Sequence, residues 1–239
     1  MERSAMANEM KKRKIDWKQI GDMMKKTFPL RRKEIVVEEP LVAEVKERWP
    51  ALFSEQQIEA EFARVTSVSL KGSLYAGLDQ YLVRFLELYN AKSGIVGLQR
   101  LTKSLADDSS ILKKRTVLLL GLPYFLKEDP SCLFKTVQAT DNEDVFTKGM
   151  KAGIVLVKEG EDIIDVSVVL EEAVFLCDLR DVPNAVAMLM GLLFALNIDY
   201  PKKLRYTFEV IQKVLMNIGG GQCSSLVHGL RNRLLRTTV

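Results

Sequence analysis

The stretch that most constrains the fold is residues 185–216, which read AVAMLMGLLFALNIDYPKKLRYTFEVIQKVLM. The first part is apolar on every side of a helix, and a helix of this kind is buried in a protein core. Asn197 and Pro201 then interrupt the chain, and apolar residues return at helical spacing as far as Leu215. The pattern predicts a buried helical hairpin over residues 182–217. A membrane span needs about 20 apolar residues, and this run is shorter, so we expect no membrane association.

The remaining pattern predicts an α+β fold in which helices dominate, with a helical N-terminal half. Apolar residues recur at helical spacing most clearly over residues 70–91, where a broad stripe should be buried. β-branched runs separated by Glu-Gly-Glu-Asp predict a small β hairpin or sheet near residues 153–177. Asp-Pro-Ser before Cys132 is a helix-start signal and predicts a short helix over residues 132–137. Residues 111–122 form a mostly apolar run that fits either a helix or a strand.

Positive charge is concentrated at the N-terminus. Residues 1–33 contain 11 Lys+Arg against 4 Asp+Glu, a local charge of +7, whereas the remainder contains 24 against 27. We interpret residues 1–33 as a basic, flexible or weakly helical arm that is followed by an extended segment at residues 35–37. A single globular, helix-rich domain is expected over residues 34–218. Three glycines then lead into an expected basic tail over residues 219–239.

Two basic clusters in this arm supply the candidate functional residues. A short basic run is typical of a nuclear-localisation signal, and it can also hold phosphate groups through a salt-sensitive electrostatic attraction. A solvated charge run without a function is the third alternative, and all three stay open. The candidate residues are Lys11, Lys12, Arg13, Lys14, Arg31, Arg32 and Lys33.

No pattern in the sequence predicts catalysis, a cofactor or a metal. The three cysteines are scattered without a CxxC pair and His228 is the only histidine, so a structural zinc site is not expected. Glu171 and Glu172 are adjacent, and because neighbours on a strand point to opposite faces, they should not converge on one substrate. A GxxxxGK[ST] phosphate-binding loop does not occur. We therefore expect no enzymatic activity, and the scattered cysteines fit reduced thiols in an intracellular compartment.

Four segments resemble a known family: WPALFSEQQI (49–58), LLLGLPYFLKEDPSCLFKT (118–136), VSVVLEEAVFLCDLRDVPNAVAMLMGLL (166–193) and ALNIDYPKKLRYTFEVIQKV (195–214). Together they are similar to an uncharacterised vertebrate family described as similar to sterile alpha motif domain-containing protein 3. The resemblance covers about residues 28–218 and implies no enzymatic activity, cofactor or catalytic residue. Members often place a sterile alpha motif, a small helical interaction domain, upstream of this region. Only a basic segment of about 30 residues precedes it here, so the resemblance implies a C-terminal module without that motif, or a shortened product.

The leading functional hypothesis is a non-enzymatic protein-interaction or scaffold module that binds a protein partner in the nucleus or cytoplasm. The alternative is a nucleic-acid-associated nuclear protein that contacts phosphates through the basic arm. The first hypothesis predicts that residues 34–218 retain specific partners. The second predicts binding that weakens steeply with salt and disappears when residues 11–14 are neutralised.

Overall fold

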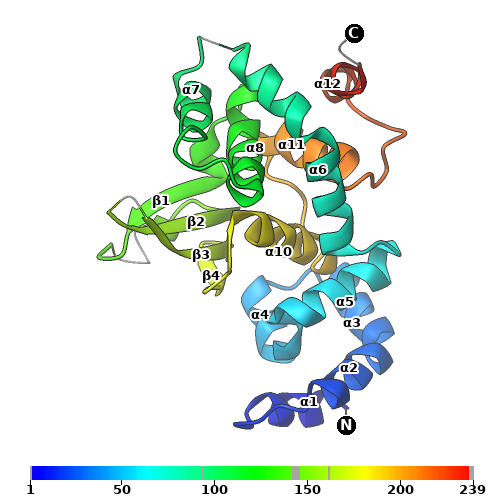
Figure 1. Cartoon of the computed structure of the whole chain (residues 1–239). Helices are drawn as coiled ribbons and strands as arrows, with labels where there is room; N and C mark the ends of the chain where they lie inside the picture. The colour runs from blue at the N-terminus through cyan, green and yellow to red at the C-terminus, as the bar shows by residue number, and fades with distance from the viewer. Residues whose placement is uncertain (1, 93, 142–145, 161, 237–239) are drawn as a thin grey trace.

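The computed structural model describes residues 2–92, 94–141, 146–160 and 162–236 (Figure 1). Helix α10 (Val182–Ala195) packs against a small sheet and against the helices α5, α6 and α8. The α+β, helix-dominated fold class is therefore confirmed. The other α-helices are α1 (Glu2–Met10), α2 (Trp17–Lys26), α3 (Phe28–Glu38), α4 (Val42–Arg48), α5 (Glu55–Thr66), α6 (Leu70–Asn90), α7 (Val96–Lys103), α8 (Ile111–Leu126), α11 (Arg205–Val210) and α12 (Ser225–Leu235).

Within the described residues, the sheet contains four strands in the order β1-β2-β3-β4: β1 (Phe134–Gln138), β2 (Ala152–Glu159), β3 (Asp162–Leu170) and β4 (Ala173–Leu176). The β2–β3 and β3–β4 pairs are antiparallel, with Ile154 opposite Val168. This confirms the sheet predicted near residues 153–177. The antiparallel register of β2 and β3 shifts between Val157 and Lys158, and such an irregularity bends the strand pair at its far end.

Strand β1 was not predicted. We expected a short helix over residues 132–137, and that expectation is wrong: only Pro130–Cys132 form a 3-10 turn, η2, before the chain becomes a strand parallel to β2. Asp129 accepts a hydrogen bond from the backbone N–H of Ser131 at 2.9 Å, so the cap signal is real but covers one turn. Pairing with a strand about 20 residues ahead then determines the conformation, which local signals cannot show.

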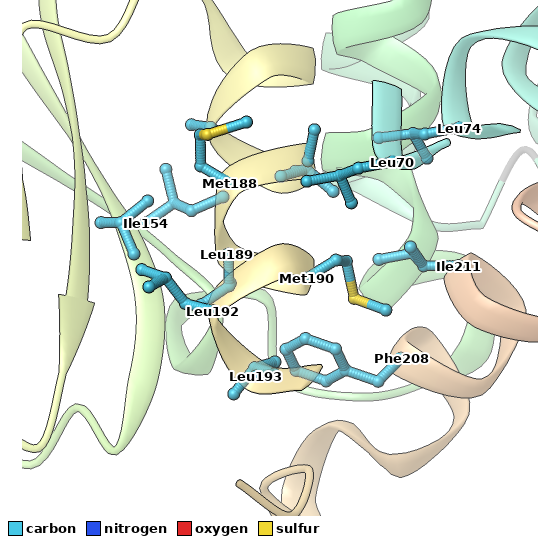
Figure 2. Close-up of a cluster of buried hydrophobic side chains, with 14 of the residues drawn as sticks. Leu70, Leu74, Ile154, Met188, Leu189, Met190, Leu192, Leu193, Phe208 and Ile211 are labelled. Carbon is cyan, nitrogen blue, oxygen red and sulfur yellow. The ribbon is translucent and has the colours of Figure 1, made fainter. Parts of the chain in front are cut away.

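Helix α10 is the centre of the core, as the hairpin pattern predicts. Asp181 caps it by accepting a hydrogen bond from the backbone N–H of Asn184 at 2.8 Å. Every residue of the helix except Phe194 is buried. Figure 2 shows α10 side chains between Ile154 of β2 on one side and Leu70 of α6 and Phe208 of α11 on the other. Each large side chain fully buried in this way contributes about 1.5–3 kcal/mol.

The second half of the hairpin is helical but divided. Residues Lys202–Leu204 form a 3-10 turn, η3, followed by α11 and by a π-helical turn, η4 (Ile211–Leu215). Asn197, at φ 57°, ends α10 in the left-handed region that asparagine tolerates. Helix α6 approaches η4 so closely that a Cβ built on Gly77 would lie 1.8 Å from the backbone oxygen of Leu215. Glycine at this position is therefore a packing requirement.

Residues 111–122, which fit helix or strand in the sequence, belong to helix α8. Ser110 caps it through its Oγ, which accepts a hydrogen bond from the backbone N–H of Lys113 at 3.2 Å. The ring of Tyr89 from α6 lies where a Cβ on Gly121 would be, and its hydroxyl donates to the backbone oxygen of Leu118 at 2.8 Å. The N-terminal cap of α8 and its contact with the buried helix α6 therefore favour a helix over residues 111–122.

Both ends of the described chain pack onto the body. The segment expected to be a flexible or weakly helical arm forms α1, α2 and α3, and these helices bury Met6, Ile20, Met24 and Ile35. The expectation of an extended segment at residues 35–37 is wrong, because α3 continues through it. The expectation of a tail after the glycines is also wrong as far as residue 235, because α12 lies there and buries Val227, Leu230 and Leu234. These three have the i, i+3, i+7 spacing of an amphipathic helix.

Candidate functional site

The first basic cluster forms an exposed turn between α1 and α2, which we call the basic turn (residues 11–14). Its position is fixed from both sides. Asp16 caps α2 by accepting hydrogen bonds from the backbone N–H groups of Lys18 and Gln19, both at 3.0 Å. Glu9 accepts a hydrogen bond from the backbone N–H of Asp16 at 3.0 Å and lies 2.5 Å from Nζ of Lys12. The hydrogen bond from Lys12 lowers the pKa of Glu9, so Lys12 is neutralised locally.

The rest of the basic turn is uncompensated. Within the part of the chain that the structure describes, Lys11, Arg13 and Lys14 form no ion pair. Trp17, at the start of α2, leaves 37% of its surface exposed. The turn therefore presents three free positive charges followed closely by an exposed indole.

Arg31, from the second basic cluster, is not a surface residue. It is fully buried on α3, where its Nε and Nη2 donate to the two carboxylate oxygens of Glu61 on α5 at 2.7 and 2.6 Å. Its Nη1 donates to Oγ1 of Thr27 at 3.0 Å, and its Nη2 also donates to the backbone oxygen of Met24 at 3.1 Å. The expectation that Arg31 contacts phosphate or an import receptor is wrong. The available signal was Glu61, which shares the buried face of α5 with Ile58 and Phe62.

Arg32 and Lys33 have different surroundings. Arg32 reaches the end of α10, where Nη1 donates to the backbone oxygens of Phe194 and Ala195 at 3.3 and 3.2 Å and Nη2 donates to Oδ1 of Asn197 at 2.9 Å. A guanidinium at a helix C-terminus satisfies the free carbonyls and complements the helix dipole. Lys33 is exposed. The structure therefore brings residues 11–14 together and separates them from Arg31 and Arg32.

A second surface was not expected from the sequence. A groove of about 220 Å³ lies between the start of α8 and strand β3, and we call it the α8–β3 groove. Leu112 is 41% exposed, Ile163 is 42% exposed and Ile164 is 53% exposed along it. Both isoleucines border one groove because the β2–β3 pairing shifts there: Val157 pairs with Asp165 and Lys158 with Ile163, which leaves Ile164 as the extra residue. The sequence contains no signal for this shift.

The α8–β3 groove also contains carboxylates. Asp165 accepts a hydrogen bond from Ser167 through Oδ2 at 2.6 Å, whereas its Oδ1 is buried and has no hydrogen-bond partner among the described residues. Asp108 accepts hydrogen bonds from the backbone N–H and the hydroxyl of Ser110, which lower its pKa. Asp181 lies 3.8 Å from the exposed Arg180. Exposed aliphatic side chains thus lie beside an incompletely paired carboxylate.

In the rest of the described chain, the histidine and cysteine side chains do not come together in an arrangement typical of a catalytic or metal site. His228 is exposed on α12, with its Nδ1 3.4 Å from Nδ2 of Asn232. Partial desolvation, together with the neighbouring carboxylates Asp129 and Asp178, raises the pKa of the Cys132 and Cys177 thiols. A raised pKa disfavours the thiolate needed for nucleophilic attack. Among the described residues, no group of three or more His, Cys, Asp or Glu side chains is placed to hold a metal ion.

The two adjacent carboxylates at residues 171 and 172 have a structural role in a turn. They form the β3–β4 turn, with φ of 47° for Glu171 and 65° for Glu172, values that favour glycine or asparagine. Glu171 Oε2 accepts a hydrogen bond from the backbone N–H of Val42 at 2.8 Å and so joins the turn to α4.

No helix in the described part of the chain is long and apolar enough to cross a membrane.

One comparison with known proteins bears on the N-terminal helices. The family model of the helical domain of sterile alpha motif domain-containing protein 3 matches residues 1–54. The match supports the family resemblance over α1 to α4 and includes the basic turn, Arg31 and Trp49. No curated protein and no solved structure shows a significant match. The matched segment is joined to the rest of the chain by the Arg31–Glu61 ion pair and by Arg32 at the end of α10.

Proposed function

We propose that this chain is a non-enzymatic protein-interaction module that acts inside the cell, in the nucleus or cytoplasm. The observation that carries the proposal is the α8–β3 groove, where Leu112, Ile163 and Ile164 are exposed side by side with carboxylates. Exposed apolar side chains gathered at one site with a polar rim are a mark of interaction surfaces.

The size of the groove fits side chains of a protein partner better than a small-molecule ligand. A pocket for a small molecule usually measures about 300–1,000 Å³, and this groove, at about 220 Å³, has room for one or two side chains. Removing an aliphatic side chain of the partner from water contributes about 1.5–3 kcal/mol. A few such central contacts dominate the affinity of most protein interfaces.

The test compares partners of the wild-type chain with those of the variant Ile163→Ser/Ile164→Ser in cells by proximity labelling. Both side chains are exposed, so the variant should fold. The matched control is Val83→Ser, which changes an apolar side chain that is 70% exposed on α6. We expect specific partners to be lost from the groove variant and retained by Val83→Ser. Identical partner sets for all three proteins would contradict the proposal.

We also propose a second candidate function, phosphate contact by the basic turn, because Lys11, Arg13 and Lys14 are exposed and unpaired. Three phosphate contacts predict a slope of about −2.7 for log K against log[salt], or about a 40-fold loss of affinity for a DNA duplex from 50 to 200 mM salt. Lys11→Gln/Arg13→Gln/Lys14→Gln should abolish this binding, whereas Lys33→Gln should not. Binding that ignores salt, or none at low salt, would exclude this function.

We further propose that residues 55–236 continue the same family's architecture beyond the matched helical domain, as a region that follows a sterile alpha motif in longer members. The two arginine contacts across residue 54 support this. Sequences of longer family members can test it. We expect Glu61 and Asn197 to accompany Arg31 and Arg32 in them, and independent variation of the paired positions would contradict the proposal.

A further inference from the structure

We infer that the α8–β3 groove receives the basic turn of a second copy of this chain, so that copies associate head to tail. This inference rests on the proposed function, because it names the occupant of the same groove. The two surfaces carry complementary chemistry: the turn presents cations followed by Trp17, and the groove presents aliphatic side chains beside carboxylates. The carboxylates of the groove outnumber its cations, and the charged residues that line it are Asp108, Asp165, Asp181, Lys113 and Arg180.

The distribution of charge along the chain agrees with this complementarity, because the N-terminal segment is basic and the region that contains the groove is acidic. Residues 1–33 contain 11 Lys+Arg against 4 Asp+Glu, whereas residues 34–200, which contain the groove, have 17 against 26. Opposite fields of this kind steer two surfaces together and favour this register over like-charged alternatives. The N-terminal helices of one copy are therefore attracted to the central part of another.

Asp165 gives the groove a specific preference for a cation. Its Oδ2 accepts a hydrogen bond from Ser167, whereas its Oδ1 is buried without a hydrogen-bond partner among the described residues. A partly shielded carboxylate of this kind interacts more strongly with a nearby cation than one in bulk water does. Leu112, Ile163 and Ile164 provide an apolar surface against which an indole can pack. Trp17 is the exposed aromatic side chain nearest the basic turn in the sequence, and tryptophan is enriched at the centres of interfaces.

The contact must form between copies. Figure 1 places α1 and α2, which flank the basic turn, at one end of the molecule, away from α8 and β3. The turn of one chain therefore does not reach its own groove. Because the turn and the groove are different surfaces, the contact is heterologous, and a head-to-tail assembly ends in one free turn and one free groove.

Sedimentation velocity of the nuclease-treated full chain tests the inference, with salt near 50 mM and near 500 mM. We expect the mass of the wild type to rise above 27.1 kDa with concentration at low salt and to return to the monomer value at high salt. The turn variant, Lys11→Gln/Arg13→Gln/Lys14→Gln, and the groove variant, Ile163→Ser/Ile164→Ser, should each be monomeric. Val83→Ser should behave as the wild type does.

Mixing the two deficient variants is the decisive measurement. The turn variant keeps an intact groove and the groove variant keeps an intact turn, so a 1:1 mixture should form a heterodimer and grow no further. A mixture that stays monomeric, or a wild type that is monomeric at low salt, overturns the inference. If the wild type is monomeric but loses its cellular partners with the groove variant, the proposed function stands and a different protein occupies the groove. If the monomeric wild type binds DNA through the turn, the turn serves nucleic acid instead.

Discussion

Arg31 and Glu61 connect the N-terminal helices to the body of the molecule through two short hydrogen bonds that are completely shielded from water. Arg64 also lies 2.8 Å from Glu61 Oε2, and the Arg31 guanidinium lies 5.4 Å from the centre of the Trp49 ring. Sequence reading placed Arg31 on the surface because its neighbours are basic. Its partner is 30 residues away, and a local charge pattern contains no information about such a contact.

Breaking this pair at one residue should destabilise the fold strongly. Arg31→Met leaves Glu61 buried without its main partner, and the loss of one partner of a buried pair reduces the free energy of unfolding by about 3–5 kcal/mol. Urea unfolding measures it. Lys33→Met, on the same helix but exposed, should change stability by no more than about 0.5 kcal/mol. The account of Arg31 is wrong if the two variants are equally stable.

Helices and strands whose conformation follows from the spacing of nearby apolar residues could be predicted from the sequence. Helix α6 is predicted within one residue, and α10 and the β2–β4 sheet are predicted near their observed bounds. Strand β1 depends on pairing with a distant strand, so a local helix signal was misleading. Helix α12 had a readable spacing, but three preceding glycines suggested the end of the fold. The α8–β3 groove could not be predicted, because it forms between segments 50 residues apart.

Two helical glycines, Gly77 in α6 and Gly229 in α12, should respond in opposite directions to substitution by alanine, because only Gly77 is packed closely against another element. Gly77→Ala places a Cβ 1.8 Å from a backbone oxygen, so a backbone shift is required and stability should fall by about 1–3 kcal/mol. Gly229→Ala in α12 meets no atom within 4 Å and should raise stability by about 0.5–1 kcal/mol, because alanine has the higher helix propensity. Thermal unfolding of both variants checks the prediction, and a shift of the same sign in both would contradict it.

Attachment of α12 should depend on pH through Glu209. Burial raises the pKa of Glu209, but hydrogen bonds from Ser224 and Lys213 outweigh it, and the net pKa is lowered from 4.5. A carboxyl with a lowered folded pKa stabilises the fold above its unfolded pKa, and this stabilisation is lost as pH falls through the folded pKa. The protection factors for amide hydrogen exchange of residues 225–235, which correct for the slower intrinsic exchange in acid, should therefore fall below about pH 4.5. In Glu209→Gln these protection factors should already be lower at neutral pH and change less with acid; an unchanged pH response would refute the assignment.

At the scale of the whole molecule, the matched helical segment and the rest of the chain form one packed structure. Residues 1–54 contribute Met24, Ile35 and Trp49 to the same core as α10. Arg31 and Arg32 each donate hydrogen bonds to residues beyond residue 54. We therefore expect a peptide of residues 1–54 to show no cooperative thermal unfolding by circular dichroism, whereas residues 1–236 should unfold in one transition. A folded 1–54 peptide would show that the segment is an independent domain.

We propose that this protein binds another protein chain at the α8–β3 groove. Proximity labelling of the wild type, Ile163→Ser/Ile164→Ser and Val83→Ser in the same cells tests this binding site. We expect partners enriched by the wild type to be lost from the groove variant alone. The same partners at the same enrichment in all three would contradict it.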